Sequence, residues 1–149
     1  MSPLKVLINF NLLCWSTILI GLRRGLISQK DVIDCAVDLI VNGNDDVEVA
    51  IIAGGESLGD EELFNLISNL VKQPDKSVDL DKWRLAHLLY IAESDDDEQT
   101  KLNRLQEVYA NFDYPEDMAS CSIYSQSEIA PLVAMIQVIE KLRIRLTQQ

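Results

Sequence analysis

Hydrophobic residues recur at helical spacing along most of this chain, and the clearest example runs from Trp15 to Gly43. Trp15, Ile18, Leu19 and Leu22 occupy positions i, i+3, i+4 and i+7, which places one apolar stripe on a first helix. Arg23 and Arg24 follow the stripe, and cations suit the C-terminal end of a helix dipole. The pattern therefore predicts a helix that ends at Gly25.

A second helix is expected directly afterwards. Its signature is an N-cap at Ser28, with Asp31 three residues later as the partner of a capping box. Asn42 and Gly43 provide a left-handed stop. The expected apolar face comprises Val32, Cys35, Ala36, Leu39 and Ile40, and the opposite face Asp31, Asp34 and Asp38. Together the two helices predict an antiparallel helical hairpin.

Similar patterns predict further helices. The expected elements are a short segment Val47–Ala53, a helix from Asp60 to Gln73, a helix 79–92 after a linker 75–78, a helix from Glu98 to Phe112, a short helix from Pro115 to about Ser120, and a last helix from Ser127. Asp45 and Asp46, Ser57 or Asp60, the acids from Asp95 to Glu98, and Ser127 are the expected caps. Residues 4–8, before Trp15, fit either a short strand or the opening turn of the first helix.

These elements indicate the fold class. About seven helices with short joints predict an all-α fold of consecutive antiparallel helical hairpins. A chain of 149 residues is most simply one domain, 1–149. A parallel sheet would need several β-rich runs, and at most two candidates exist.

The charge is strongly negative and concentrated in the middle of the chain. The net charge is −11, and residues 44–126 hold 19 acidic against 6 basic side chains. Such a field repels nucleic acid and anionic lipid and favours a basic protein partner. Three acidic clusters at expected helix joints are candidate partner-binding sites, although surface charge often serves solubility alone. The clusters comprise Asp45, Asp46, Glu56, Asp60, Glu61, Glu62, Asp95, Asp96, Asp97 and Glu98. Alternate loops of a helical array open at the same end, so these clusters can form one patch.

Cysteine usage and the N-terminal region indicate a cytoplasmic protein. Cys14, Cys35 and Cys121 are odd in number, widely spaced and set in apolar surroundings, which suits reduced core thiols. The first 22 residues resemble a signal peptide only superficially, because Asn9 and Asn11 interrupt the apolar run and no small-residue cleavage site follows. A membrane span is not expected, since the run is short and polar.

One pattern is typical of an enzyme. Gly55-Glu56-Ser57-Leu58-Gly59 reads G-x-S-x-G, between a possible strand Val47–Ala53 and a helix. A hydrolase nucleophile needs this order, with His87 as the only histidine available as a base. That fold also needs a multistranded parallel sheet, which the helical periodicity does not provide. We interpret the pattern as a joint between helices, and we interpret His87 as a structural residue of an apolar helix.

Metal and cofactor sites are not expected. No C-x-x-C or H-x-x-x-H pairing is present for zinc. A calcium loop starting at Asp95 would place Thr100 where glycine is needed and Gln106 where glutamate is needed. Trp15 and Trp83 lie in apolar stripes and are expected to pack in the core.

Several segments resemble a bacterial family catalogued only as a domain of unknown function. These are Trp15-Ser16-Thr17-Ile18 with Ile20-Gly21-Leu22, Gly25-Leu26-Ile27-Ser28 with Asp31-Val32-Ile33 and Ala36-Val37, Lys82-Trp83, and the acidic run from Glu107 to Met118. The run 112–118, Phe-Asp-Tyr-Pro-Glu-Asp-Met, is the most distinctive. The resemblance spans about residues 10–124 and does not extend to the last helix.

Members of that family resemble immunity proteins of contact-dependent growth inhibition and related polymorphic-toxin systems. The resemblance implies a protein that is not an enzyme and that neutralises a cognate toxin C-terminal domain, often a basic nuclease. No small-molecule substrate follows from it. Tyr114 and Tyr124 are candidate aromatic anchors beside the acidic clusters. An alternative is a helical adaptor that uses the last helix, whose tail Lys141-Leu142-Arg143-Ile144-Arg145 is basic.

Overall fold

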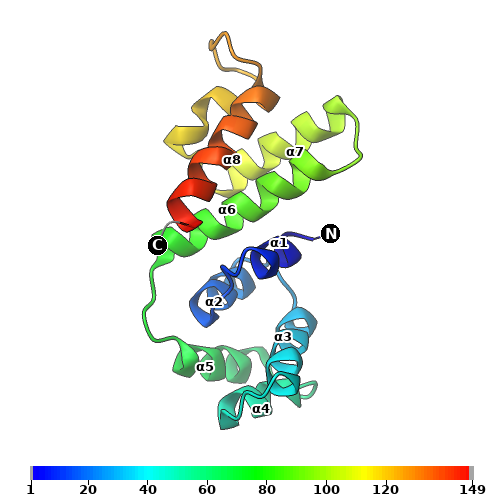
Figure 1. Ribbon diagram of the computed structural model, residues 1–149, viewed down its shortest axis with the longest axis vertical. Coiled ribbons are helices and arrows are strands. Elements are labelled where there is room, and N and C mark those ends of the chain that lie inside the picture. The colour runs from blue at the N-terminus through cyan, green and yellow to red at the C-terminus, as the bar shows by residue number, and fades with distance from the viewer. Residues whose placement is uncertain (1, 148–149) are drawn as a thin grey trace. The chain divides into compact units, whose positions relative to one another are not determined.

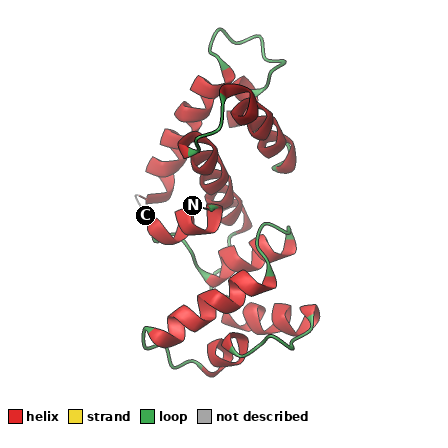
Figure 2. Ribbon diagram, turned by 90° about the vertical axis from the view of Figure 1, so that its right-hand side faces the viewer, coloured by secondary structure: helices red, strands yellow, loops and turns green. Residues whose placement is uncertain are grey.

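A computed structural model describes residues 2–147, and every regular element within that range is a helix (Figure 2). The all-α prediction is therefore confirmed. The elements are α1 (Pro3–Asn9), α2 (Trp15–Arg23), α3 (Gln29–Val41), α4 (Val47–Ala53), α5 (Asp60–Leu70), α6 (Lys76–Glu93), α7 (Glu98–Asn111), the 3₁₀ helix η1 (Glu116–Cys121) and α8 (Pro131–Thr147), labelled in Figure 1 apart from η1.

The chain forms two compact units. One comprises residues 2–12 and 80–147, and the other comprises residues 13–79. The division falls inside α6, between Asp79 and Leu80. Residues 2–12 belong to the same unit as the C-terminal half of the chain and not to that of the segment that follows them. That the chain behaves as a single domain stays a prediction.

The unit 13–79 contains α2 to α5. Helices α3 and α4 pack against each other across a short loop, and both α2 and α4 contact α5. The predicted capping box starts α3, because Ser28 Oγ accepts the N–H of Asp31 while the Asp31 carboxylate accepts that of Ser28. The core of this unit is aliphatic and includes Ile18, Val32, Ala36, Val49, Ile52, Leu63 and Ile67.

A buried carboxylate joins the two ends of this unit. Asp79 is 2% exposed. Thr17 Oγ1 donates to its Oδ1 at 2.7 Å, and Ser16 Oγ donates to its Oδ2. Hydrogen bonds of this kind compensate for removing a carboxylate from water. They fix the start of α2 to the start of α6, 62 and 63 residues away along the chain.

The unit of residues 2–12 and 80–147 contains α1, most of α6, α7, η1 and α8. Helix α8 packs against both η1 and α7, and η1 also contacts α7. Its core includes Val6, Leu7, Trp83, Leu85, Leu88, Leu105, Met118, Met135 and Leu142. The expected burial of Trp83 is confirmed, whereas Trp15 in the other unit stays partly exposed.

Two helix starts differ from the prediction. Helix α6 begins at Lys76 and not at Asp79, because Asp75 accepts the N–H of Val78 at 3.2 Å and caps the first turn. Helix α8 begins at Pro131 and not near Ser127. Proline disfavours the helical conformation in the residue before it and is suited to the first helical position. Ser127 instead accepts the N–H of Ile129 at 3.2 Å within the preceding loop.

Three smaller differences concern the ends of short elements. Residues 4–8 lie in α1, a separate helix that ends at Asn9, so they form neither a strand nor the opening turn of α2. Pro115 is the N-cap of η1 and not its first residue. Neither Ser57 nor Asp60 caps α5, whose N-cap is Gly59 without a side-chain hydrogen bond.

Candidate functional site

The strongest charge feature of the chain lies on α3, α4 and α5. Residues 31–71 contain ten acidic side chains and no lysine or arginine. All ten lie on α3 or α4, in the loops that follow these two helices, or in the first turn of α5. The acidic charge expected from the sequence is therefore presented by three helices, of which α4 contacts both α3 and α5.

The loop between α3 and α4 holds Asp45 and Asp46, both exposed. Asp46 is the N-cap of α4, and its carboxylate accepts the N–H of Glu48 at 2.9 Å. The side chain of Asn44 accepts the N–H of Asp46 at 2.9 Å. The expected capping role of Asp46 is confirmed, and the Asp45 carboxylate stays in solvent.

The loop between α4 and α5 contains Gly55 and Glu56. A Cβ at Gly55 would lie 2.9 Å from the carbonyl oxygen of Ile52 and 2.5 Å from the Leu58 side chain, so this tight turn requires glycine. Glu61 and Glu62 are exposed in the first turn of α5, where they suit the helix dipole. Asp60 accepts a hydrogen bond from Gln29 Nε2 at 2.6 Å, which ties α5 to α3.

These two acidic loops lie at opposite ends of α4. Asp46 precedes its first residue and Glu56 follows its last. Successive loops of a helical array open at opposite ends, so they do not form one patch at a single end. The unit instead presents acidic groups at both ends of the α3–α4 pair.

The third acidic cluster, from Asp95 to Glu98, joins α6 to α7 beside a cleft of about 390 Å³. The cleft is lined by Tyr90, Glu93, Ser94, Asp95, Asp96 and Arg104. Asp96 pairs with Arg104 at 2.8 Å, and Asp97 caps α7 by accepting the N–H of Thr100 at 2.8 Å. Hydrogen bonding from Thr100 lowers the pKa of Asp97 below its ordinary value. Tyr90, Glu93 and Arg104 were not expected here, although residues 90, 93 and 94 share one helix edge by spacing.

Tyr114 follows α7 in a strained turn. Asp113 and Tyr114 have φ values of 64° and 53°. The N–H of Tyr114 donates to the carbonyl of Tyr109 at 2.9 Å and that of Asp113 to the carbonyl of Ala110 at 3.1 Å, which is a Schellman motif. The rings of Tyr109 and Tyr114 meet edge to face at 5.1 Å. Tyr114 is 64% exposed and Tyr124, in the loop before α8, is 87% exposed.

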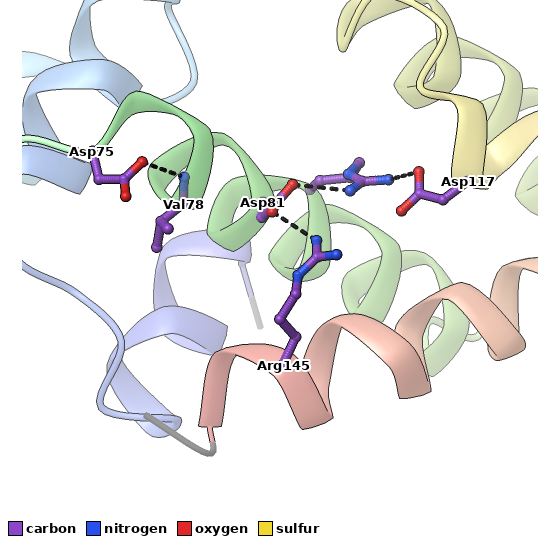
Figure 3. A network of polar contacts seen from close by, with 6 residues as sticks. Asp75, Val78, Asp81, Asp117 and Arg145 are labelled. Carbon is purple, nitrogen blue, oxygen red and sulfur yellow. Dashed lines mark hydrogen bonds and ion pairs between the residues drawn. The ribbon is translucent and has the colours of Figure 1, made fainter.

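An ion-pair network holds α6, η1 and α8 together (Figure 3). Arg84 is buried and bonds to Asp117 and, at 2.9 Å, to Asp81, which also binds Arg145 at 2.7 Å. Burial alone would lower the pKa of Arg84, but the hydrogen bonds to the two carboxylates raise it overall. A guanidinium enclosed in this way supports the fold of its unit.

The basic C-terminal tail is partly engaged within the same unit. Arg145 binds Asp81, and the Arg143 guanidinium lies 5.3 Å from the centre of the Phe10 ring. Leu142 and Leu146 are buried, whereas Val133, Ile136 and Ile144 are exposed. Helix α8 is therefore a core helix with an exposed apolar side.

The G-x-S-x-G run of residues 55–59 does not have the strand before it that a nucleophile elbow requires. Val47–Ala53 is helix α4 and not a strand. His87 is partly exposed, beside the rings of Trp83 and Phe112, with its Nε2 buried and without a hydrogen-bond partner among the described residues. Burial lowers the pKa of His87. These contacts are those of a structural histidine.

The cysteines differ from one another in exposure. Cys121 is buried, and burial, with a contribution from the Asp117 charge, raises the pKa of its thiol to about 11. Cys35 is half-buried, and Cys14 is exposed at the start of α2 with its Sγ 3.2 Å from Thr17 Oγ1. The expectation of a core thiol is wrong for Cys14, because the N-cap position faces solvent.

No group of three or more His, Cys, Asp or Glu side chains within residues 2–147 has the arrangement to hold a metal ion. No helix in the same range is both long and apolar enough to cross a membrane.

Comparison with known proteins gives one match. The model of a family described as "Uncharacterized protein conserved in bacteria (DUF2247)" matches residues 4–149. No curated protein and no solved structure matches the chain. The match includes the last helix, which lay outside the segments on which the resemblance was based.

Proposed function

The chain belongs to DUF2247, a family of uncharacterized proteins conserved in bacteria, and we propose that it is a cytoplasmic immunity protein that binds and neutralises a cognate toxin domain. The partner would be a basic protein of the nuclease type, and the chain would act by binding without catalysing a reaction. The resemblance to immunity proteins of contact-dependent growth inhibition motivates this proposal.

The observation that supports the proposal most is a set of exposed acidic side chains that form no ion pair within the described part of the fold. Within residues 2–147, Asp45, Glu56, Glu61, Glu62 and Asp95 form no ion pair and are exposed. Solvated carboxylates at helix ends retain their charge for a partner. A field of this sign accelerates encounter with a cationic protein by about 10-fold to 1,000-fold at low salt.

A helical adaptor is the alternative function. The exposed aliphatic residues Val133, Ile136 and Ile144 on α8 favour it, because an apolar helix side is suited to pairing with a partner helix. Removing residues 127–149 separates the possibilities poorly, since Met135 and Leu142 are core residues whose loss unfolds their unit. Substitution of the exposed residues alone is the cleaner experiment.

The decisive test of immunity uses a candidate toxin domain, which is to be sought among the proteins encoded next to the gene for this chain. Co-expression should restore growth of cells that produce that domain, and the purified proteins should bind with an association rate that falls steeply with salt. If the wild-type chain neither binds the domain nor restores growth, the proposal is wrong.

Charge variants test the acidic clusters one at a time. Glu61→Gln with Glu62→Gln leaves the Asp60 bond to Gln29 intact, and Asp95→Asn leaves both the Asp97 cap and the Asp96 ion pair intact. Each variant should slow association several-fold at low salt and little at high salt. Glu128→Gln, exposed in the loop before α8, is the control for Asp95→Asn, because each of these variants removes one negative charge. Equal slowing by the control would show that net charge matters and that these positions do not.

A further inference from the structure

Two valines at the end of the α3–α4 pair are left in solvent. Val41, the last residue of α3, is 78% exposed, and Val47, the first residue of α4, is 71% exposed. Val37 and Ile51, one turn further from the loop, are 40% and 46% exposed. At spacing i, i+4 each pair shares a helix side, opposite the side that buries Val32 and Val49. We name residues 41–47 the α3–α4 tip.

The surroundings of the α3–α4 tip are acidic. Asp45 and Asp46 lie between the two valines, and Asp34 and Asp38 stand beside Val37 and Val41 at spacing i, i+3 on α3. No lysine or arginine occurs between positions 31 and 71. The tip therefore combines exposed aliphatic side chains with charge of a single sign.

We infer that the α3–α4 tip is a docking surface for a cationic protein segment that carries aliphatic side chains. The inference rests on the proposed function, and it identifies the segment as part of the toxin domain. Charge complementarity selects this occupant. A second copy of the chain would bring the Asp45 and Asp46 of each molecule together, and an anionic lipid surface would be repelled.

The tip also differs from the other acidic clusters. At the start of α5, Leu63 is 1% exposed and so faces the core beside the acidic Glu61 and Glu62. Carboxylates of this kind steer association, whereas buried aliphatic contacts supply binding energy that slows dissociation. The tip thus anchors the partner that the neighbouring charges attract.

The first experiment tests the chemistry of the tip with defined peptides. The probe is a synthetic amphipathic helix of lysine and leucine, and its control is a lysine–serine peptide of equal charge. Titrated into isotope-labelled full-length chain, the lysine–leucine peptide should shift amide resonances of residues 37–51 at lower concentration than those of residues 56–62 or 95–98. The control should show no such preference. Equal response of all acidic clusters to both peptides would overturn the inference.

The second experiment uses the toxin domain and a double variant. Val41→Ser with Val47→Ser removes the exposed aliphatic groups at little cost to folding, because serine and valine have similar helix propensity. If the two valines become buried on binding, the variant should bind about 30-fold more weakly or worse. Burying a fully exposed valine contributes about one factor of ten, and Val41 and Val47 are 78% and 71% exposed before binding. The change should appear in the dissociation rate.

The control is Val133→Ser with Ile144→Ser, which removes two aliphatic groups that are 52% and 51% exposed from α8. It should bind the toxin domain like the wild type. If the wild-type chain binds and the tip variant is weakened less than about threefold, the docking surface is wrong and the immunity function stands. If the wild-type chain does not bind, the function itself is wrong, and the peptide titration still decides the chemistry of the tip.

Discussion

Replacing Arg84 by methionine should destabilise the unit of residues 2–12 and 80–147 substantially. The guanidinium is 6% exposed and bonds to Asp81 and Asp117, whereas Arg104, which pairs with Asp96, is 41% exposed. Methionine retains the apolar contacts of the arginine stem but leaves both carboxylates without that cation. Arg84→Met and Arg104→Met therefore remove one arginine each from a buried and an exposed ion pair.

The magnitude follows from the exposure of the carboxylates left behind. Removing one partner of a fully buried pair costs about 3–5 kcal/mol. Asp117 is 41% exposed and can regain water, and Asp81 keeps its bond to Arg145, so the loss should be smaller. We expect about 2–3 kcal/mol, or about 4–12 °C in Tm for a chain of this size. Arg104→Met should cost about 1 kcal/mol or less.

Urea unfolding followed by tryptophan fluorescence measures both variants. Trp83 is buried in the same helix as Arg84, and Trp15 lies in the other unit. A Trp15→Phe background therefore makes the signal report the unit that contains the network. If Arg84→Met lowers the free energy of unfolding no more than Arg104→Met does, the reasoning from burial is refuted.

Three further predictions concern local structure. Gly55→Ala should destabilise the chain by about 1–3 kcal/mol, because the added Cβ would lie 2.9 Å from the carbonyl oxygen of Ile52; an unchanged urea midpoint would contradict this. Since burial lowers the pKa of His87, the folded state resists protonation there, so stability is complete above about pH 6.5 and falls as pH drops from that value towards the lower folded pKa. His87→Phe should show a smaller loss of Tm between pH 7.5 and 5.5 than the wild type, and an identical loss would refute the assignment. A thiol reagent should label Cys14 in the native protein and Cys121 only after unfolding, which mass spectrometry of the labelled peptides would verify.

The features that the sequence determined by itself are local. Ser28 with Asp31, Asp46 with Glu48, and Asp97 with Thr100 form caps as expected, since each hydrogen bond joins residues two or three positions apart. Periodicity likewise identified α2, α3 and α5 to α8, together with the burial of Trp83, but it did not decide the structure of α1 or α4. The negative charge of the acidic clusters is likewise known from the sequence, because composition does not depend on the fold.

The starts of α6 and α8, which were predicted wrongly, show the limit of inference from neighbouring residues alone. Asp75 and Ser127 are both residue types that cap helices, but the sequence predicted a cap only at Ser127 and placed Asp75 in the linker 75–78. Asp75 does cap its helix, whereas Ser127 stabilises a turn four residues before α8. The restriction that Pro131 places on its neighbour was present in the sequence and decided the second case.

Tertiary structure alone decided which hydrophobic residues are covered and which distant polar groups meet. Val41 and Val47 fit the apolar composition of a core, yet no neighbouring helix covers them, so they became the candidate docking surface. The bonds of Asp79 to Thr17 and of Arg84 to Asp117 join residues 62 and 33 positions apart. Helical periodicity specifies the sides of each helix but not its neighbours, because packing of helices depends on the whole chain closing into a common core.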